Sequence, residues 1–195
     1  MLKELVKKSR SYRAFNEDRV ITKEELLELV DLTRYCPSTV NRQPLKYYLA
    51  WEKEEVEKIL ATTTWAKALK DIKLPYDGKH PTAFIIICQD TDVDANLNRF
   101  LRDVGLVAQT MILGAVEKDL GGIMIGSFHA GKVTEIMSMP ENIHPMLVLA
   151  FGEPAEEIIL HEVDPEDSIG YYRDENDVHH VPKRKLSDIV LNGGK

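Results

Sequence analysis

Apolar residues recur with helical spacing in some segments of the chain and with strand-like spacing in others. Helical spacing predicts helices over five segments, residues 2–8, 22–35, 53–63, 93–122 and 130–139. The second helix should begin at a capping box, because Thr22 is followed three residues later by Glu25. The fourth is the longest and its second half is almost entirely apolar, so it is predicted to be the core helix. Gly121 and Gly122 are expected to end it.

Runs of β-branched and aromatic residues predict the strands between these helices. They cover residues 46–51, 82–90 and 144–154, with a short strand or turn over 123–128. The run at 82–90, "TAFIIICQD", is typical of a strand that is covered on both faces. The stretch from Trp65 to Pro81 mixes charge with proline and glycine and is predicted to be an irregular connection. The whole pattern indicates a single α+β domain in which helices flank a central sheet.

The character of the chain changes after about residue 155. From there to residue 195 the sequence is polar, with single apolar residues but no long apolar stripe. A segment without such a stripe lacks the apolar face from which a core is built. It is therefore predicted to be an arm that lies over another surface.

Composition and charge exclude several classes of protein. The 195 residues carry a formal net charge of −7, so a nucleic-acid binder held by phosphate contacts is not expected. No apolar run approaches the roughly 20 residues of a membrane helix, and the charged N-terminus does not resemble a signal peptide. Cys36 and Cys88 predict buried free thiols in a reducing compartment, which places the protein in the cytoplasm. The histidines lack metal-ligand spacing, so no metal site is predicted.

Four segments remain as candidates for binding a ligand. In "SRSYRAF" at 9–15, two guanidinium groups and a hydroxyl can bind a phosphate. "PSTVNRQP" at 37–44 offers hydroxyls and amides that can read the edge of a heterocycle. In "GGIMIGSF" at 121–128, Gly126 lets a flat ligand approach the backbone closely, and "VPKRKLSDIV" at 181–190 concentrates cations in an acidic chain. Taken alone, each segment is also typical of an ordinary surface turn.

Together and in this order, the segments resemble the FMN-dependent nitroreductase family over essentially the whole chain. "SRSYRAF" is similar to the family's N-terminal Arg-Arg-Ser-x-Arg-x-Phe signature, and "CPSTVNRQP" is similar to its "APSxxNxQP" loop. The long apolar helix from near Asp103, the glycine-rich turn after it and the basic segment before "LSDIV" also match. Two positions depart from the family pattern: Ser9 stands where an arginine is usual, and Met124 stands where a tryptophan is common.

The resemblance implies a fold, an assembly and a reaction. The fold would be α+β with a central sheet that contains antiparallel strands. Two chains would form a homodimer with FMN at the interface, and residues 155–195 would be exchanged as an arm onto the partner. NADH or NADPH would give hydride to flavin N5, and an electron-poor small molecule such as a nitroaromatic or a quinone would then receive it in a ping-pong reaction. No protein residue is expected to be catalytic, because the cofactor carries the chemistry.

The same resemblance implies which residues hold FMN. Residues from both ends of the chain would meet the phosphate: Arg10, Ser11 and either Lys183 or Arg184. Arg13 would lie near the pyrimidine edge of the flavin. Five loop residues would come from the partner subunit or line the ring: Pro37, Ser38, Thr39, Asn41 and Gln43. Ile125 and Gly126 would lie along the flavin. Two alternatives stay open, a related flavoprotein with oxygen-dependent or dehalogenating chemistry and a flavin-binding protein without an enzymatic role.

Overall fold

The computed structural model describes residues 1–66, 69 and 72–192 of the chain. The chain divides into two compact units, Met1–Ala155 and Glu156–Lys195. The predicted irregular connection, residues 65–81, is confirmed where it is described, because that part contains turns and bends but no helix or strand. Residues 67–68 and 70–71 of the same prediction lie outside the described residues.

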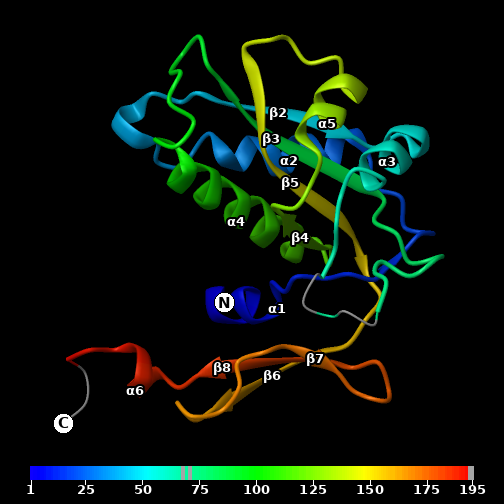
Figure 1. Cartoon of the computed structure of the whole chain (residues 1–195), viewed down its shortest axis with the longest axis vertical. Coiled ribbons are helices and arrows are strands. Elements are labelled where there is room, and N and C mark those ends of the chain that lie inside the picture. The colour runs from blue at the N-terminus through cyan, green and yellow to red at the C-terminus, as the bar shows by residue number, and fades with distance from the viewer. Residues whose placement is uncertain (67–68, 70–71, 193–195) are drawn as a thin grey trace. The chain divides into compact units, whose positions relative to one another are not determined.

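A five-stranded antiparallel sheet is the frame of the first unit (Figure 1). Its strands are β1 (Phe15–Asn16), β2 (Leu45–Ala50), β3 (Ala83–Asp90), β4 (Gly121–Ile125) and β5 (Ile143–Pro154). β3 lies between β2 and β5, and the other edge of β5 pairs with β4 and β1. The predicted α+β class is confirmed, and so are the two long strands expected at 82–90 and 144–154.

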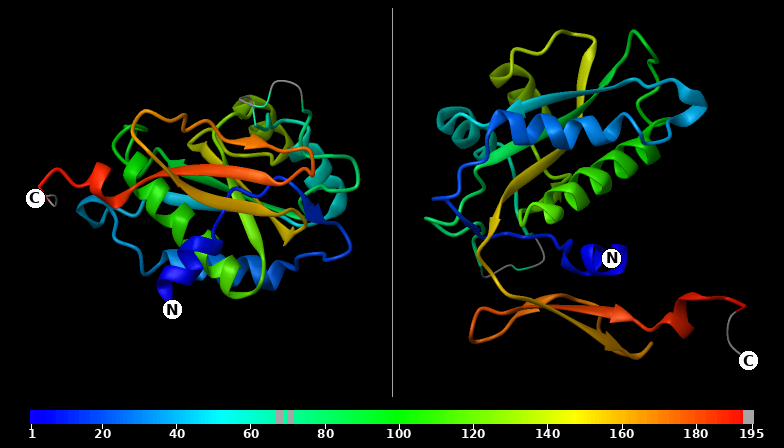
Figure 2. Two further views of the ribbon diagram at one scale, coloured as in Figure 1. Left: turned by 90° about the horizontal axis from the view of Figure 1, so that it is seen from below. Right: turned by 180° about the vertical axis from the view of Figure 1, so that it is seen from behind.

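Helices cover both faces of this sheet (Figure 2). They are α1 (Leu2–Lys8), α2 (Lys23–Thr33), α3 (Lys53–Leu60), α4 (Leu101–Glu117) and α5 (Ala130–Ile136). α2 and α4 pack together over one face, α3 and α5 lie over the other, and α1 contacts α4. Among these described helices, none combines the length and the apolar character that a membrane crossing requires.

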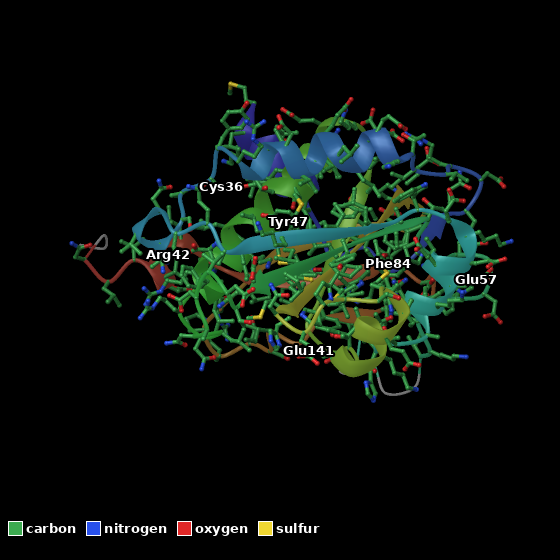
Figure 3. The ribbon with its side chains drawn as sticks, turned by 90° about the horizontal axis from the view of Figure 1, so that it is seen from above. Cys36, Arg42, Tyr47, Glu57, Phe84 and Glu141 are labelled. Carbon is green, nitrogen blue, oxygen red and sulfur yellow. The ribbon has the colours of Figure 1, made fainter. Side chains whose placement is uncertain are left out.

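Strand β3 shows why the sheet needs both helical layers. Ile85 and Ile87 pack into the cluster formed with α2 and α4. Phe84 and Ile86 point the other way, into the cluster formed with α3 and α5, and Figure 3 shows Phe84 inside the molecule. All four side chains are fully buried. The alternation follows from the two-residue period of a strand, and it confirms the prediction that this strand is covered on both faces.

The longest predicted helix is shorter than its pattern suggested. α4 begins at Leu101, whereas residues 93–100 form turns in which Asp94 and Asn96 accept N–H groups two residues ahead, at 2.9 and 3.1 Å. Such side-chain bonds offer the backbone an alternative to helix. At the other end α4 stops at Glu117, and Asp119 takes a left-handed conformation with φ of 56°. The predicted helix over 93–122 is therefore wrong at both ends.

Gly121 and Gly122 do not end α4 but lie in strand β4. A Cβ added to Gly121 would stand 2.4 Å from the Tyr12 ring and 2.7 Å from the Pro154 side chain. One added to Gly122 would stand 3.0 Å from the Ala150 carbonyl oxygen. These glycines are needed for close packing between strands, which single-chain periodicity does not reveal.

The second unit has secondary structure of its own. β6 (Ile158–Val163) pairs in parallel with β8 (His179–Arg184), and β7 (Tyr172–Arg173) pairs with β8 in the antiparallel sense. A short helix, α6 (Leu186–Ile189), follows. A buried ion pair between Arg173 and Glu156 joins β7 to the start of the unit. The sequence pattern did not predict these strands, because apolar residues occur there singly and without a sustained period.

Both cysteines are free, as predicted, but only Cys88 is buried. Burial raises the pKa of the Cys88 thiol to about 12, so this group stays protonated near neutral pH. Cys36 is half-buried, and its Sγ lies 3.2 Å from Thr110 Oγ1 on α4. The prediction of burial is therefore wrong for Cys36, which stands at the start of the loop after α2.

Candidate functional site

The N-terminal segment of the site runs beside strand β4. Ser11 forms a parallel bridge with Gly122, and the Tyr12 N–H donates to the Gly122 carbonyl oxygen at 3.3 Å. Ile125 ends β4 and is buried. A Cβ added to the next residue, Gly126, would meet no atom within 4 Å. The structure therefore brings two predicted segments together, and the backbone at Gly126 borders open space that a flat group can approach.

Arg10 carries a charge that the described residues leave unmatched. Its Nη2 donates to the Val6 carbonyl oxygen at 2.7 Å, but its Nε is buried without a hydrogen-bond partner. No carboxylate among the described residues forms an ion pair with it. Partial burial lowers the pKa of the Arg10 guanidinium, against a smaller raising effect of Tyr12. A buried N–H donor without an acceptor lowers stability, and a bound anion would accept the hydrogen bond from the Arg10 Nε.

Arg13 has a different environment from Arg10. It is only 8% exposed, and its Nη1 donates to the Ser11 carbonyl oxygen at 2.9 Å. This bond fixes the backbone on which Ser11 is presented, and the Ser11 side chain itself is exposed. The expected place of Arg13 at the pyrimidine edge of a flavin stays a prediction.

The second segment of the site, residues 37–43, is a strained loop. Three of its residues, Val40, Asn41 and Gln43, have left-handed backbones with φ of 49°, 52° and 51°. Each such residue costs on the order of 1 kcal/mol unless it is glycine. The loop is held by α4: the Asp103 carboxylate accepts hydrogen bonds from Ser38 Oγ at 2.8 Å and from the Thr39 N–H and Oγ1 at 2.8 and 2.7 Å.

Asp103 belongs to the site but was not among the residues that the sequence singled out. It lies in the first turn of α4 and is 3% exposed. Burial opposes ionisation of this carboxyl, but the hydrogen bonds from Thr39 and Ser38 outweigh burial and lower its pKa. The signal that could have found it is an acidic residue beside Val104 on the apolar face of a helix, because a buried carboxylate needs partners.

The two segments lie at opposite ends of α4 (Figure 1). The loop binds Asp103 in the first turn, whereas Ser11 lies beside Gly122, which follows the last turn. α4 has 17 residues, and a helix of that length spans about 25 Å. One chain therefore holds Ser38 and Thr39 at the first turn of α4 and Ser11 beyond its last turn, while Ser9, next to Arg10, accepts a hydrogen bond from Gln109 Nε2 at 3.2 Å midway along the helix.

The basic residues of the tail lie in the second unit. Arg184 donates from Nη1 to the Asp164 carbonyl oxygen, and Lys185 forms an ion pair with the Asp164 carboxylate. Lys183 is exposed on β8. Their expected contact with the same anion as Arg10 stays a prediction.

Comparison with known proteins decides the family. The nitroreductase family model matches residues 6–153, which is well over half of the chain. The chain belongs to the nitroreductase family. The resemblance carried by the two motifs is thereby confirmed, and this nitroreductase family chain is an oxidoreductase.

Several relatives agree with this assignment. A provisionally named NADH dehydrogenase/NAD(P)H nitroreductase of Methanothermobacter thermautotrophicus is 26% identical over 157 residues, which are 78% of this chain and 77% of the relative. A solved nitroreductase family protein of Clostridium difficile 630 is 25% identical, with 98% of both chains covered and a TM-score of 0.65. An FMN-dependent nitroreductase of Clostridium difficile R20291 is 19% identical and covers 78% of this chain and 87% of its own, with a TM-score of 0.61.

Proposed function

We propose that this chain binds FMN and transfers reducing equivalents from NADH or NADPH to an electron-poor acceptor such as a nitroaromatic or a quinone. The observation that carries the proposal is the buried, unpartnered Nε of Arg10, which needs an anion. A phosphate satisfies it, because a guanidinium binds phosphate oxygens at two points. The solved FMN-dependent nitroreductase and the NAD(P)H nitroreductase relative support the choice of cofactor and reductant.

The chain's own part in the reaction is binding and orientation. Arg10 and the exposed Ser11 would hold the phosphate of FMN, and the open backbone at Gly126 would lie along its ring. Asn41 and Gln43 expose amides that can pair with the polar edge of a flavin. When bound, FMN supplies a site that accepts hydride from NAD(P)H and gives it up to the acceptor.

The spectrum of the purified protein tests this proposal. We expect bound FMN, whose visible absorption is bleached by NADH without oxygen and restored by a nitroaromatic or a quinone. Failure to bind added FMN would contradict the proposal. FMN that NADH never bleaches would favour a flavin-binding role without catalysis. Bleached FMN that only oxygen or a halogenated compound restores would favour the other flavoprotein chemistry.

We also propose that the protein is a homodimer in which each FMN contacts both chains. The support is the separation of Ser11, beside Gly122, from the loop at 37–43, on Asp103, since a site that uses both needs a second copy. The outer side of α4 fits a partner, because Leu106 is exposed on it, facing away from the buried stripe of the helix. The exchange of residues 155–195 between the chains is part of the same proposal.

Replacing Leu106 with aspartate is expected to weaken the dimer and FMN retention together. Leu106 is 46% exposed, and an aspartate there would place a charge against the partner. Leu27 on α2, which is 47% exposed, gives the matched control L27D. Sedimentation and the flavin content of both variants measure the effect. An L106D protein that stays dimeric with its full flavin content would contradict this placement of the interface.

A further inference from the structure

A hydrogen-bonded relay runs from α4 into the loop at residues 37–43. The Asp103 carboxylate accepts the hydroxyl protons of both Ser38 and Thr39, together with the Thr39 backbone N–H. Ser38 Oγ in turn accepts the Gln43 backbone N–H at 3.1 Å. The Gln43 Nε2 then donates to Asn41 Oδ1 at 3.0 Å. One buried carboxylate is thus connected to each polar residue of the loop that was expected to meet a flavin.

The directions of these hydrogen bonds indicate that Ser38 and Thr39 have a different role from Asn41 and Gln43. A hydroxyl has one proton, and those of Ser38 and Thr39 point inward to Asp103. Neither hydroxyl is therefore a donor toward a ligand while this network stands. The amides of Asn41 and Gln43 are on the exposed side of the loop, and both residues have left-handed backbones that need external support.

We propose that Asp103 is the positioning residue of the flavin-binding loop, and that Ser38 and Thr39 anchor the loop rather than contact the ligand. This inference rests on the proposed function, because the ligand that the loop meets is FMN. Asp103 acts at a distance: its carboxylate holds Ser38, Ser38 holds the Gln43 backbone, and the exposed amides are thereby kept in one arrangement.

The test is FMN titration of the full-length protein after its flavin has been removed. Asp103→Ala is expected to weaken FMN binding by about tenfold or more, because hydrogen bonds to a buried charge are lost and donors are orphaned. Asp103→Asn keeps an acceptor for the Ser38 hydroxyl and the Thr39 N–H, so it should stay within about threefold of the natural chain. The double variant S38A/D103A should lose no more affinity than the worse single variant, because both act through one network.

A matched control separates positioning from general loss of stability. Met111 is fully buried on α4, eight residues after Asp103, and belongs to the apolar cluster shared with α2. M111A should lower the melting temperature as D103A does but leave the FMN affinity and the absorption maximum of bound FMN unchanged. If M111A weakens FMN binding as much as D103A does at equal stability, or if D103A binds FMN as tightly as the natural chain, Asp103 is not a positioning residue.

A readout without flavin keeps this inference separate from the proposed function. Amide hydrogen exchange of the flavin-free protein should be faster at Thr39 and Gln43 in D103A than in M111A, because these N–H groups are held by Asp103 and Ser38. A natural chain that binds no FMN would overturn the proposed function and the ligand assigned to the loop. Unchanged exchange in D103A would overturn the positioning role of Asp103, whatever the protein binds.

Discussion

Replacing Arg10 with alanine is expected to weaken FMN binding by about tenfold or more, because a charge-assisted bond contributes roughly 1.5–3 kcal/mol. The Arg10 Nε is buried and lacks a hydrogen-bond partner, and we expect it to bind the FMN phosphate. The alanine variant lacks this contact, and the described residues offer no substitute for it. Fluorescence titration of the flavin-free protein with FMN measures the change. The overall fold should be kept, because within the described part of the chain the Arg10 side chain hydrogen-bonds only to Val6, in the adjoining helix α1.

Arg34→Ala is the matched control for this experiment. Arg34 is an exposed arginine at the end of α2 that pairs with Asp31 at 2.6 Å. An exposed pair of this kind contributes little, so R34A should retain the natural FMN affinity. Equal affinity in R10A and R34A would remove Arg10 from the site and would leave its buried Nε unexplained.

Replacing Gly121 with alanine is expected to lower the free energy of unfolding by about 1–3 kcal/mol, which is the usual cost of overpacking. The added methyl would stand 2.4 Å from the Tyr12 ring and 2.7 Å from the Pro154 side chain. Because Tyr12 directly follows Ser11, its displacement should also weaken FMN binding. Urea unfolding and FMN titration of the same preparation measure both effects.

Gly131→Ala is the matched control for the second experiment. A Cβ at Gly131 would come no closer than 3.7 Å to another side chain, and the residue lies in helix α5. Alanine is favoured over glycine in a helix, so G131A should be as stable as the natural chain or more stable. A G121A protein of natural stability would show that Tyr12 and Pro154 move aside without cost.

Much of the fold was predictable because its signals are local. The capping box at Thr22 and Glu25 forms as expected, with bonds of 3.2 and 2.9 Å. The buried strand over 82–90 was evident from its own composition. The place of Gly121 after α4 was not, because it depends on close packing against Tyr12, which lies far away in the sequence. At the start of α4 the apolar spacing outweighed a local signal, since the Asp94 side chain binds the backbone two residues ahead.

The candidate site also contains residues that local sequence signals revealed and residues that they did not. Arg10 and the loop at 37–43 were found because their residue types are unusual over a short stretch. Asp103 was not found, since its role in the site depends on a hydrogen bond from Thr39, which lies 64 residues earlier. The inward direction of the Ser38 and Thr39 hydroxyls was equally out of reach, because residue types show which groups can donate but not where they point.

In the proposed dimer, each FMN site takes the segment with Arg10 and Ser11 from one chain and the loop at 37–43 from the other. This division determines how substitutions in the two segments combine. A protein made only of R10A chains damages both sites, and so does a protein made only of D103A chains. In a mixed dimer of one R10A chain and one D103A chain, one FMN site carries both substitutions and the other FMN site carries neither. Mixing the R10A and D103A proteins would then restore FMN binding at one site of each mixed dimer once the subunits exchange.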